Sequence, residues 1–179
     1  MKPAPTALRA APFGLLPLLL LIAGCGYHVA GKADLLPKEV GTIAVPAFEN
    51  VTTRYRLNQE MAGAVTREFI RRTRYRIVPK PEDADAILYG AVVNYNAYPT
   101  TLDSSNGRTA GMLTIVVLDV RLVEEGTGKL LYRNAGLTVQ GRYEISTDQA
   151  RYFEESDTSL QRVSHDVAQT LVSAILEDF

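Results

Sequence analysis

Few side chains in this sequence are of the types that carry out chemistry. The 179 residues include one Cys and two His, which excludes an internal disulfide and a zinc site built on several Cys ligands. His28 and His165 lie far apart and share no motif. No G-x-S-x-G, H-E-x-x-H, P-loop or G-x-G-x-x-G pattern occurs, and these spacings mark nucleophiles, metal ligands and phosphate sites. We therefore expect no enzymatic activity, no metal and no cofactor.

Pairs of neighbouring carboxylates are the remaining candidates for acid–base chemistry. The pairs are Asp83/Asp85, Glu124/Glu125 and Glu154/Glu155. Each pair falls in an expected turn or helix end, where acidic side chains are usually exposed. We interpret all of them as solvated side chains.

The single Cys lies where its thiol has a specific use. Residues 13–22 form an uncharged run of about 10 residues, roughly half of a membrane-spanning helix, and a short cationic stretch precedes it, as in a signal peptide. Ile22-Ala23-Gly24-Cys25 then resembles the bacterial lipobox, whose Cys is joined to a diacylglycerol, with cleavage before it and acylation of the new amine. We expect residues 1–24 to be removed and Cys25 to be lipidated; the alternative is a buried Cys beside an ordinary cleavage site.

The balance of charged residues excludes some classes of binding partner. Lys and Arg total 19 against 20 Asp and Glu, and 46% of the residues are hydrophobic, which argues against a nucleic-acid-binding protein and against disorder. After Cys25 no apolar run is long enough to span a bilayer, so its acyl chains would be the membrane anchor. Gly26 follows Cys25, which by resemblance to the sorting rule of enteric bacteria favours the outer membrane.

Apolar periodicity predicts a first amphipathic helix. Its buried stripe recurs every four residues, at Leu57, Met61, Val65 and Phe69. We expect its opposite face to be polar and exposed, with the members Asn58, Gln59, Arg67, Glu68, Arg71 and Arg72. Arg67, Arg71 and Arg74 share one side of the helix, and this side is either a solvated surface or a contact for an anionic partner.

A second amphipathic helix is predicted at the end of the chain. Its stripe comprises Leu160, Val163, Val167, Leu171, Ala174 and Ile175, and His165 falls on its polar side. We expect its N-terminal cap at Ser156 or further upstream, near residues 146–148.

Short apolar or alternating segments predict five strands. They cover residues 42–48, 75–78, 86–98, 112–123 and 130–140. The last three strands are joined by the turn segments 103–107 and 125–128, so they should pair as an antiparallel meander.

The order β-α-β-β-β-β-α predicts an α+β two-layer sandwich, with two amphipathic helices packed on one face of a mixed, mostly antiparallel sheet. Residues 25–40 show no periodicity, so we expect them to form a lipidated N-terminal tether. Residues 41–179 are then a single domain, which suits a chain of this length.

Several short motifs together resemble one family. The first two motifs are Cys25-Gly26-Tyr27-His28 and Thr42-Ile43-Ala44-Val45-Pro46, and Phe48-Glu49-Asn50 follows the second. One expected strand opens with Asp83-Ala84-Asp85-Ala86-Ile87-Leu88-Tyr89-Gly90. Another expected strand is preceded by Asn106-Gly107. Their order and spacing are similar to the lipopolysaccharide-assembly lipoprotein family, LptE, over nearly the whole mature chain. That family has the fold expected above.

The resemblance implies a lipid-anchored protein on the periplasmic face of the bacterial outer membrane. It would assist the assembly of a large β-barrel, the LptD translocon, and plug its lumen while lipopolysaccharide passes to the outer leaflet. Family members are also thought to contact lipopolysaccharide through basic side chains near the Asn-Gly loop and near the start of the last helix. Ser105 stands where a basic residue would precede Asn106, so Arg108 and Arg151 are the substitutes by location.

A second interpretation is an envelope lipoprotein that binds or carries lipid without a barrel partner. It would need a cavity between helices and sheet. The stripes carry enough Leu, Ile, Val and Phe to close a core instead, so the barrel partner is our first expectation.

Overall fold

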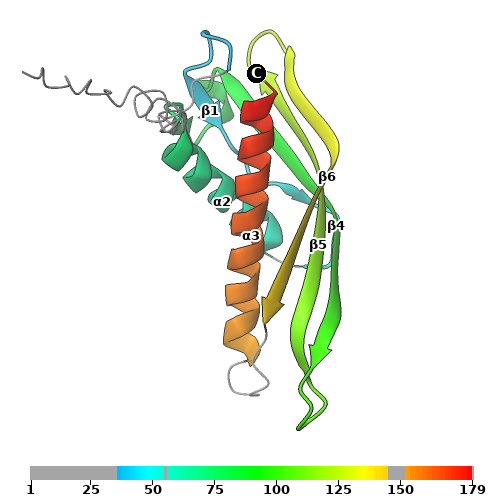
Figure 1. Ribbon diagram of the computed structural model, residues 1–179. Coiled ribbons are helices and arrows are strands. Elements are labelled where there is room, and N and C mark those ends of the chain that lie inside the picture. Colours follow the sequence, from blue (N-terminus) through cyan, green and yellow to red (C-terminus); the bar gives the residue numbers. More distant parts are fainter. Residues whose placement is uncertain (1–35, 55, 145–151, 179) are drawn as a thin grey trace, which may run out of the picture. The chain divides into compact units, whose positions relative to one another are not determined.

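The computed structural model describes residues 36–54, 56–144 and 152–178. The elements in chain order are β1 (Thr42–Ala44), β2 (Glu49–Asn50), α2 (Leu57–Arg72), β3 (Arg76–Val78), the 3₁₀ helix η1 (Pro81–Asp83), β4 (Ala86–Leu102), β5 (Thr109–Glu124), β6 (Leu130–Glu144) and α3 (Tyr152–Glu177). Helices α2 and α3 lie on the same side of the strands (Figure 1). Two helices thus form one layer and the sheet forms the other, which confirms the predicted α+β sandwich.

The described strands form one six-stranded mixed sheet in the order β3-β1-β4-β5-β6, with β2 beside β4. Strand β1 runs parallel to β3 and to β4, because α2 carries the chain back between β1 and β3. Strands β4, β5 and β6 pair antiparallel. The predicted meander is therefore confirmed, and its long strands extend beyond the short parallel ones (Figure 1).

The strand boundaries differ from the predicted ones. The first strand ends at Ala44 instead of residue 48, and Pro46, which has no N–H to donate, lies two residues after its end. Strand β2 was not predicted because two residues carry no periodicity. Strand β4 continues to Leu102, and the pairing register shifts next to Pro99, since a bulge is where a sheet accepts proline.

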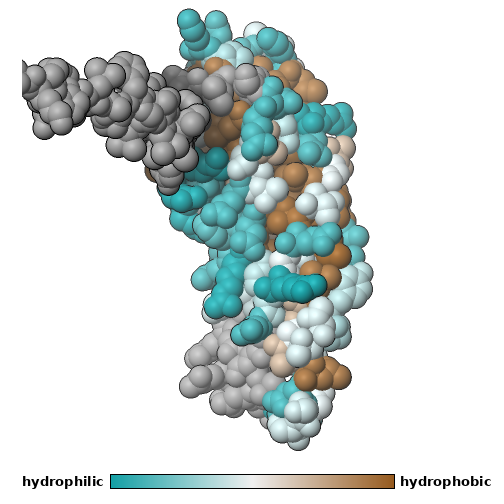
Figure 2. Space-filling view, in the orientation of Figure 1, coloured by the Kyte–Doolittle hydropathy of each residue, from teal (hydrophilic) through white to brown (hydrophobic). Residues whose placement is uncertain are grey.

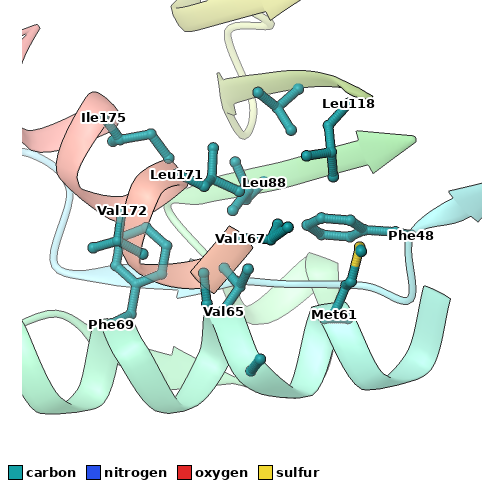
Figure 3. Close-up of a cluster of buried hydrophobic side chains, with 14 of the residues drawn as sticks. Phe48, Met61, Val65, Phe69, Leu88, Leu118, Val167, Leu171, Val172 and Ile175 are labelled. Atoms are coloured by element: carbon teal, nitrogen blue, oxygen red, sulfur yellow. The ribbon is translucent and has the colours of Figure 1, made fainter. Parts of the chain in front are cut away.

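One hydrophobic core lies between the helices and the sheet. The labelled side chains of α2, α3, β4 and β5 point toward one another in Figure 3. The predicted stripe of α2 is buried, and so are Val163, Val167, Leu171 and Ile175 of α3. A smaller cluster of Ala44, Ala84 and Ile87 lies on the second face of the sheet, because Ala44 and Ile87 alternate with core residues along their strands.

Two details of the helices were predicted wrongly. Glu68 was expected on the polar face, yet it is only 2% exposed. Its carboxylate accepts hydrogen bonds from Arg71 Nε and Nη2 at 3.0 and 2.7 Å, because a buried carboxylate needs a charged partner. Ser156 does not cap the last helix, since α3 already begins at Tyr152; residues 146–148 lie outside the described residues.

Phe48 ties the segment after β1 to the core. Its ring is buried and lies so close to Gly90 that a Cβ added there would be 2.6 Å from ring atoms Cδ2 and Cε2. Real Cβ contacts do not occur at that distance. Gly90 is therefore required for the ring of Phe48 to lie on strand β4.

We predict that Gly90→Ala destabilises the fold by about 2 kcal/mol, because overpacking a closed core forces neighbouring atoms to move. Urea denaturation of the full chain measures the effect. Gly136→Ala is the matched control, since a Cβ at Gly136 has nothing within 4 Å. Equal stability of the two variants would contradict the role assigned to Gly90.

Asp85 joins β1 to the start of β4. Its Oδ2 accepts hydrogen bonds from Gly41 N at 2.9 Å, Thr42 N at 2.8 Å and Thr42 Oγ1 at 2.7 Å. These bonds, that of the Thr42 hydroxyl foremost, hold the pKa of the Asp85 carboxyl below its usual value. Asp85 was interpreted as an ordinary solvated side chain; it is exposed, but it has this specific role.

Because the folded-state pKa of Asp85 is lowered, its contribution to stability is present above the unfolded-state pKa of about 3.9 and is lost as the pH falls through the folded value. We predict that Asp85→Asn lowers the free energy of unfolding by about 1 kcal/mol at neutral pH, a figure reduced for solvent screening. The difference from the wild type should shrink below about pH 4. Urea denaturation across pH measures it, with the exposed Asp83→Asn as control; a difference independent of pH would contradict the assignment.

Candidate functional site

The turn between β4 and β5 has a defined geometry. Asp103 Oδ1 accepts hydrogen bonds from Ser105 N at 2.8 Å and Ser105 Oγ at 2.6 Å. Gly107 N donates to Asp103 O at 2.8 Å, and Gly107 has φ +67°, a conformation that favours glycine. The predicted Asn-Gly turn is confirmed. It fixes the backbone of Arg108, whose N–H donates to Asn106 Oδ1 at 2.9 Å, at the entrance to β5.

A groove of about 370 Å³ lies next to this end of the hairpin. We call it the hairpin groove, and its lining residues are Thr100, Thr101, Gly111, Met112, Arg142, Tyr143 and Glu144. They come from β4, β5 and β6. The groove therefore combines hydroxyl groups, one guanidinium, one carboxylate and apolar surface, and an amphiphilic ligand suits such a mixed lining.

Tyr143 links the hairpin groove to α3. Its hydroxyl donates a hydrogen bond to Asp166 Oδ2 at 2.7 Å. Burial and then the neighbouring Asp166 raise the pKa of Tyr143, so the hydroxyl remains a donor at neutral pH. Gly141 leaves the space that the Tyr143 side chain occupies along β6, because a Cβ there would collide with the phenol.

The hairpin end also exposes apolar surface. Tyr98 is 50% exposed and Leu102 is 62% exposed, and both belong to the last part of β4. Figure 2 shows a hydrophobic area near this tip, apart from the hydrophilic surface of the helices. Exposed large apolar side chains beside a cationic group are typical of a surface that meets a partner.

The structure describes only some of the predicted site residues. Arg108 lies exposed beside the turn, as expected. Arg151 and Cys25 lie outside the described residues. Arg142 of the hairpin groove was missed, because the predicted strand ended at residue 140; continued alternation of β6 would have placed it opposite Leu113.

Two arginines of α2 form contacts with other side chains of the fold. Arg71 binds Glu68, and Arg72 Nη1 donates to Ser173 Oγ of α3 at 2.6 Å. The first contact lies within α2, and the second joins α2 to α3. Arg67 and Arg74 are exposed, so the predicted basic face of this helix does not act as one charged group.

Other site types are also without candidates in the part of the chain that the structure describes. No group of three His, Cys, Asp or Glu side chains there could hold a metal ion. Among the same residues, no helix combines the length and the apolar character needed to cross a membrane.

Comparison with protein families decides the identity. The family described as "LptE: Lipopolysaccharide-assembly" matches residues 40–175. The chain belongs to the LptE family. The match runs from the residues before β1 into the last turns of α3, so it covers the sheet, both helices and the hairpin groove. The description of this family names lipopolysaccharide assembly as its role.

Solved structures show the same fold at low sequence identity. An uncharacterised lipoprotein B from Nitrosomonas europaea is similar at 17% identity and a TM-score of 0.50, covering 85% of this chain and 96% of that chain. The hypothetical protein CT253 from Chlamydia trachomatis is similar at 12% identity and a TM-score of 0.52, covering 76% of this chain and 96% of that chain. No curated protein sequence matches this chain significantly.

Proposed function

We propose that this LptE family member is an outer-membrane lipoprotein that assists the assembly of an LptD-type β-barrel and plugs its lumen while lipopolysaccharide moves to the outer leaflet. The family match over residues 40–175 carries the proposal. The sequence, without a recognisable catalytic motif, agrees with a protein that acts by binding and filling space.

The proposal includes the way in which the protein reaches the membrane. Residues 1–24 are a signal peptide that is removed, and Cys25 carries the lipid that anchors the chain to the periplasmic face of the outer membrane. Residues 25–40 are the tether, and residues 41–179 are one domain. Two or three acyl chains suffice for stable anchoring at about 0.8 kcal/mol per buried methylene.

The architecture is suited to filling a barrel. A barrel of many strands has a polar lumen that must be occupied to prevent leakage. The helices cover one face of the sheet, and the core side chains Phe69, Leu88 and Leu171 are almost fully buried. The domain is therefore closed around its own core, which does not favour a lipid carrier with an internal cavity.

We assign lipopolysaccharide contact to the hairpin end. Arg108 and Arg151 are the basic residues that the family resemblance nominates, and Arg142 adds a guanidinium in the hairpin groove. The planar guanidinium binds phosphate oxygens in pairs, as the phosphates of lipid A require. Tyr98 and Leu102 supply exposed apolar surface at the same end for the acyl part of the ligand.

Affinity purification of the tagged full-length chain from outer membranes in mild detergent tests the function. We expect a large β-barrel protein to be recovered at about one copy per lipoprotein, because a plug is stoichiometric with its barrel. Mass spectrometry and quantitative amino-acid analysis give the identity and the ratio.

Recovery of the chain without a barrel would contradict the proposal. Extractable lipid bound to the chain, without a barrel, would support the alternative of an envelope lipid-binding lipoprotein. A variant with Cys25→Ser is the control, since its lost anchor should reduce recovery from the outer membrane without changing the fold.

A further inference from the structure

A second polar pocket lies on the face of the sheet that the helices leave uncovered. Its side chains alternate with core residues: Tyr89 and Ala91 lie between Leu88 and Val92 of β4, which are buried. The volume of the pocket is about 180 Å³. The pocket lies toward the β5–β6 turn, whereas the hairpin groove adjoins the β4–β5 end of the sheet.

The short side chain of Ala91 leaves room for the pocket. Gly90 and Ala91 line the pocket, and the neighbouring strands carry long charged side chains at the same level. Ala91 pairs with Glu49 of β2 on one side and with Asp119 of β5 on the other. Two carboxylates therefore flank a short side chain across three adjacent strands, about 4.8 Å apart from strand to strand.

Two arginines form the other half of the pocket. Arg121 of β5 pairs directly with Arg133 of β6, and both line the pocket. The Arg121 guanidinium lies over the ring of Tyr89, 5.0 Å from its centroid, which fixes its position. Like charges directly opposite each other on neighbouring strands are unfavourable, so an anion that bridges the two arginines would stabilise the pair.

The fold does not supply that anion. Within the part of the chain that the structure describes, neither Arg121 nor Arg133 has an ion pair with Glu49 or Asp119. Glu49 and Asp119 belong to the cross-strand row of Ala91, and the two arginines belong to the row of Tyr89. The two rows are two residues apart along the strands, a separation of about 7 Å. The pocket is thus divided into a cationic half and an anionic half, and among the described residues neither half has an ion-pair partner in the other.

We propose that this pocket binds a zwitterion carrying a phosphate and a primary ammonium, the chemistry of phosphoethanolamine. The paired guanidinium groups take the phosphate, since their N–H groups match phosphate oxygens. The carboxylates of Glu49 and Asp119 take the ammonium and repel a phosphate that lacks one, which provides specificity. The site does not depend on a barrel partner or on the hairpin groove.

Calorimetric titration of the full-length chain, reconstituted in phosphatidylcholine nanodiscs, with O-phosphoethanolamine tests the proposal. We expect saturable binding that weakens tenfold or more in Arg121→Gln and in Arg133→Gln. Arg76→Gln, an exposed arginine on the opposite edge strand β3, is the matched control and should bind as the wild type does. Circular dichroism of each variant verifies that it is folded.

The matched ligands test the ammonium half of the pocket. Phosphocholine, whose quaternary ammonium cannot donate hydrogen bonds, and inorganic phosphate should each bind at least tenfold more weakly than O-phosphoethanolamine. Asp119→Asn should reduce this preference for the zwitterion. Absence of binding, equal binding by the arginine variants, or equal binding of the three ligands would overturn the proposal.

The source of the zwitterion is a lipid head group or a free metabolite, and the lipid of the nanodisc separates the two. If head groups reach the pocket, phosphatidylethanolamine nanodiscs raise the apparent Kd for free O-phosphoethanolamine through competition. If the free form is the ligand, the Kd is the same in both nanodiscs. Either result supports binding at the pocket and identifies the source of the zwitterion.

Discussion

The packing of α2 and α3 together against one face of the sheet is the constraint on which the rest of the structure depends. Burial of apolar surface at about 25 cal/mol per Å² is the main stabilising contribution in such a layer. The apolar stripes of both helices and the inward-facing residues of β4 and β5 are buried in this core (Figure 3). The bond from Arg72 to Ser173 then joins the two helices, while Arg71 pairs with the buried Glu68 within α2.

One-sided packing leaves exposed the two surfaces that we propose for recognition. The first is the end of the β4–β5 hairpin, where Tyr98 and Leu102 are exposed and Arg108 and Arg142 supply positive charge. The second is the uncovered face, where Arg121 and Arg133 lie opposite each other. Both surfaces are built on long strands, which hold side chains in fixed positions better than loops do. In both proposals the sheet carries the recognition surface, and the helices stabilise the sheet.

The fold could be predicted from the sequence wherever periodicity spans several turns or strand pairs. The stripe of Leu57, Met61, Val65 and Phe69 and the Asn106-Gly107 turn were sufficient for α2 and for the first hairpin. Strand β2 could not be predicted, because it depends on the ring of Phe48 lying over Gly90, a contact between residues distant in sequence. The burial of Glu68 could not be predicted from the sequence either, because tertiary packing determines its environment.

The site was less predictable than the fold. Arg108 could be located from the turn next to it, whereas Arg142 needed the length of β6 and its register with β5. The facing of Arg121 and Arg133 likewise depends on the bulge that shifts the register between Leu118 and Val120. A sequence shows which residues carry charge, but cross-strand register decides which charges meet.

We propose that the hairpin end of the sheet is the surface that contacts lipopolysaccharide. The most direct measurement is the binding of lipopolysaccharide to the full-length chain with Arg108→Gln and Arg142→Gln combined, compared with Arg76→Gln. We predict that the double variant loses about tenfold or more in affinity, as expected for the loss of charge-assisted bonds to phosphate, while Arg76→Gln binds normally. Equal affinity of the two variants would contradict it.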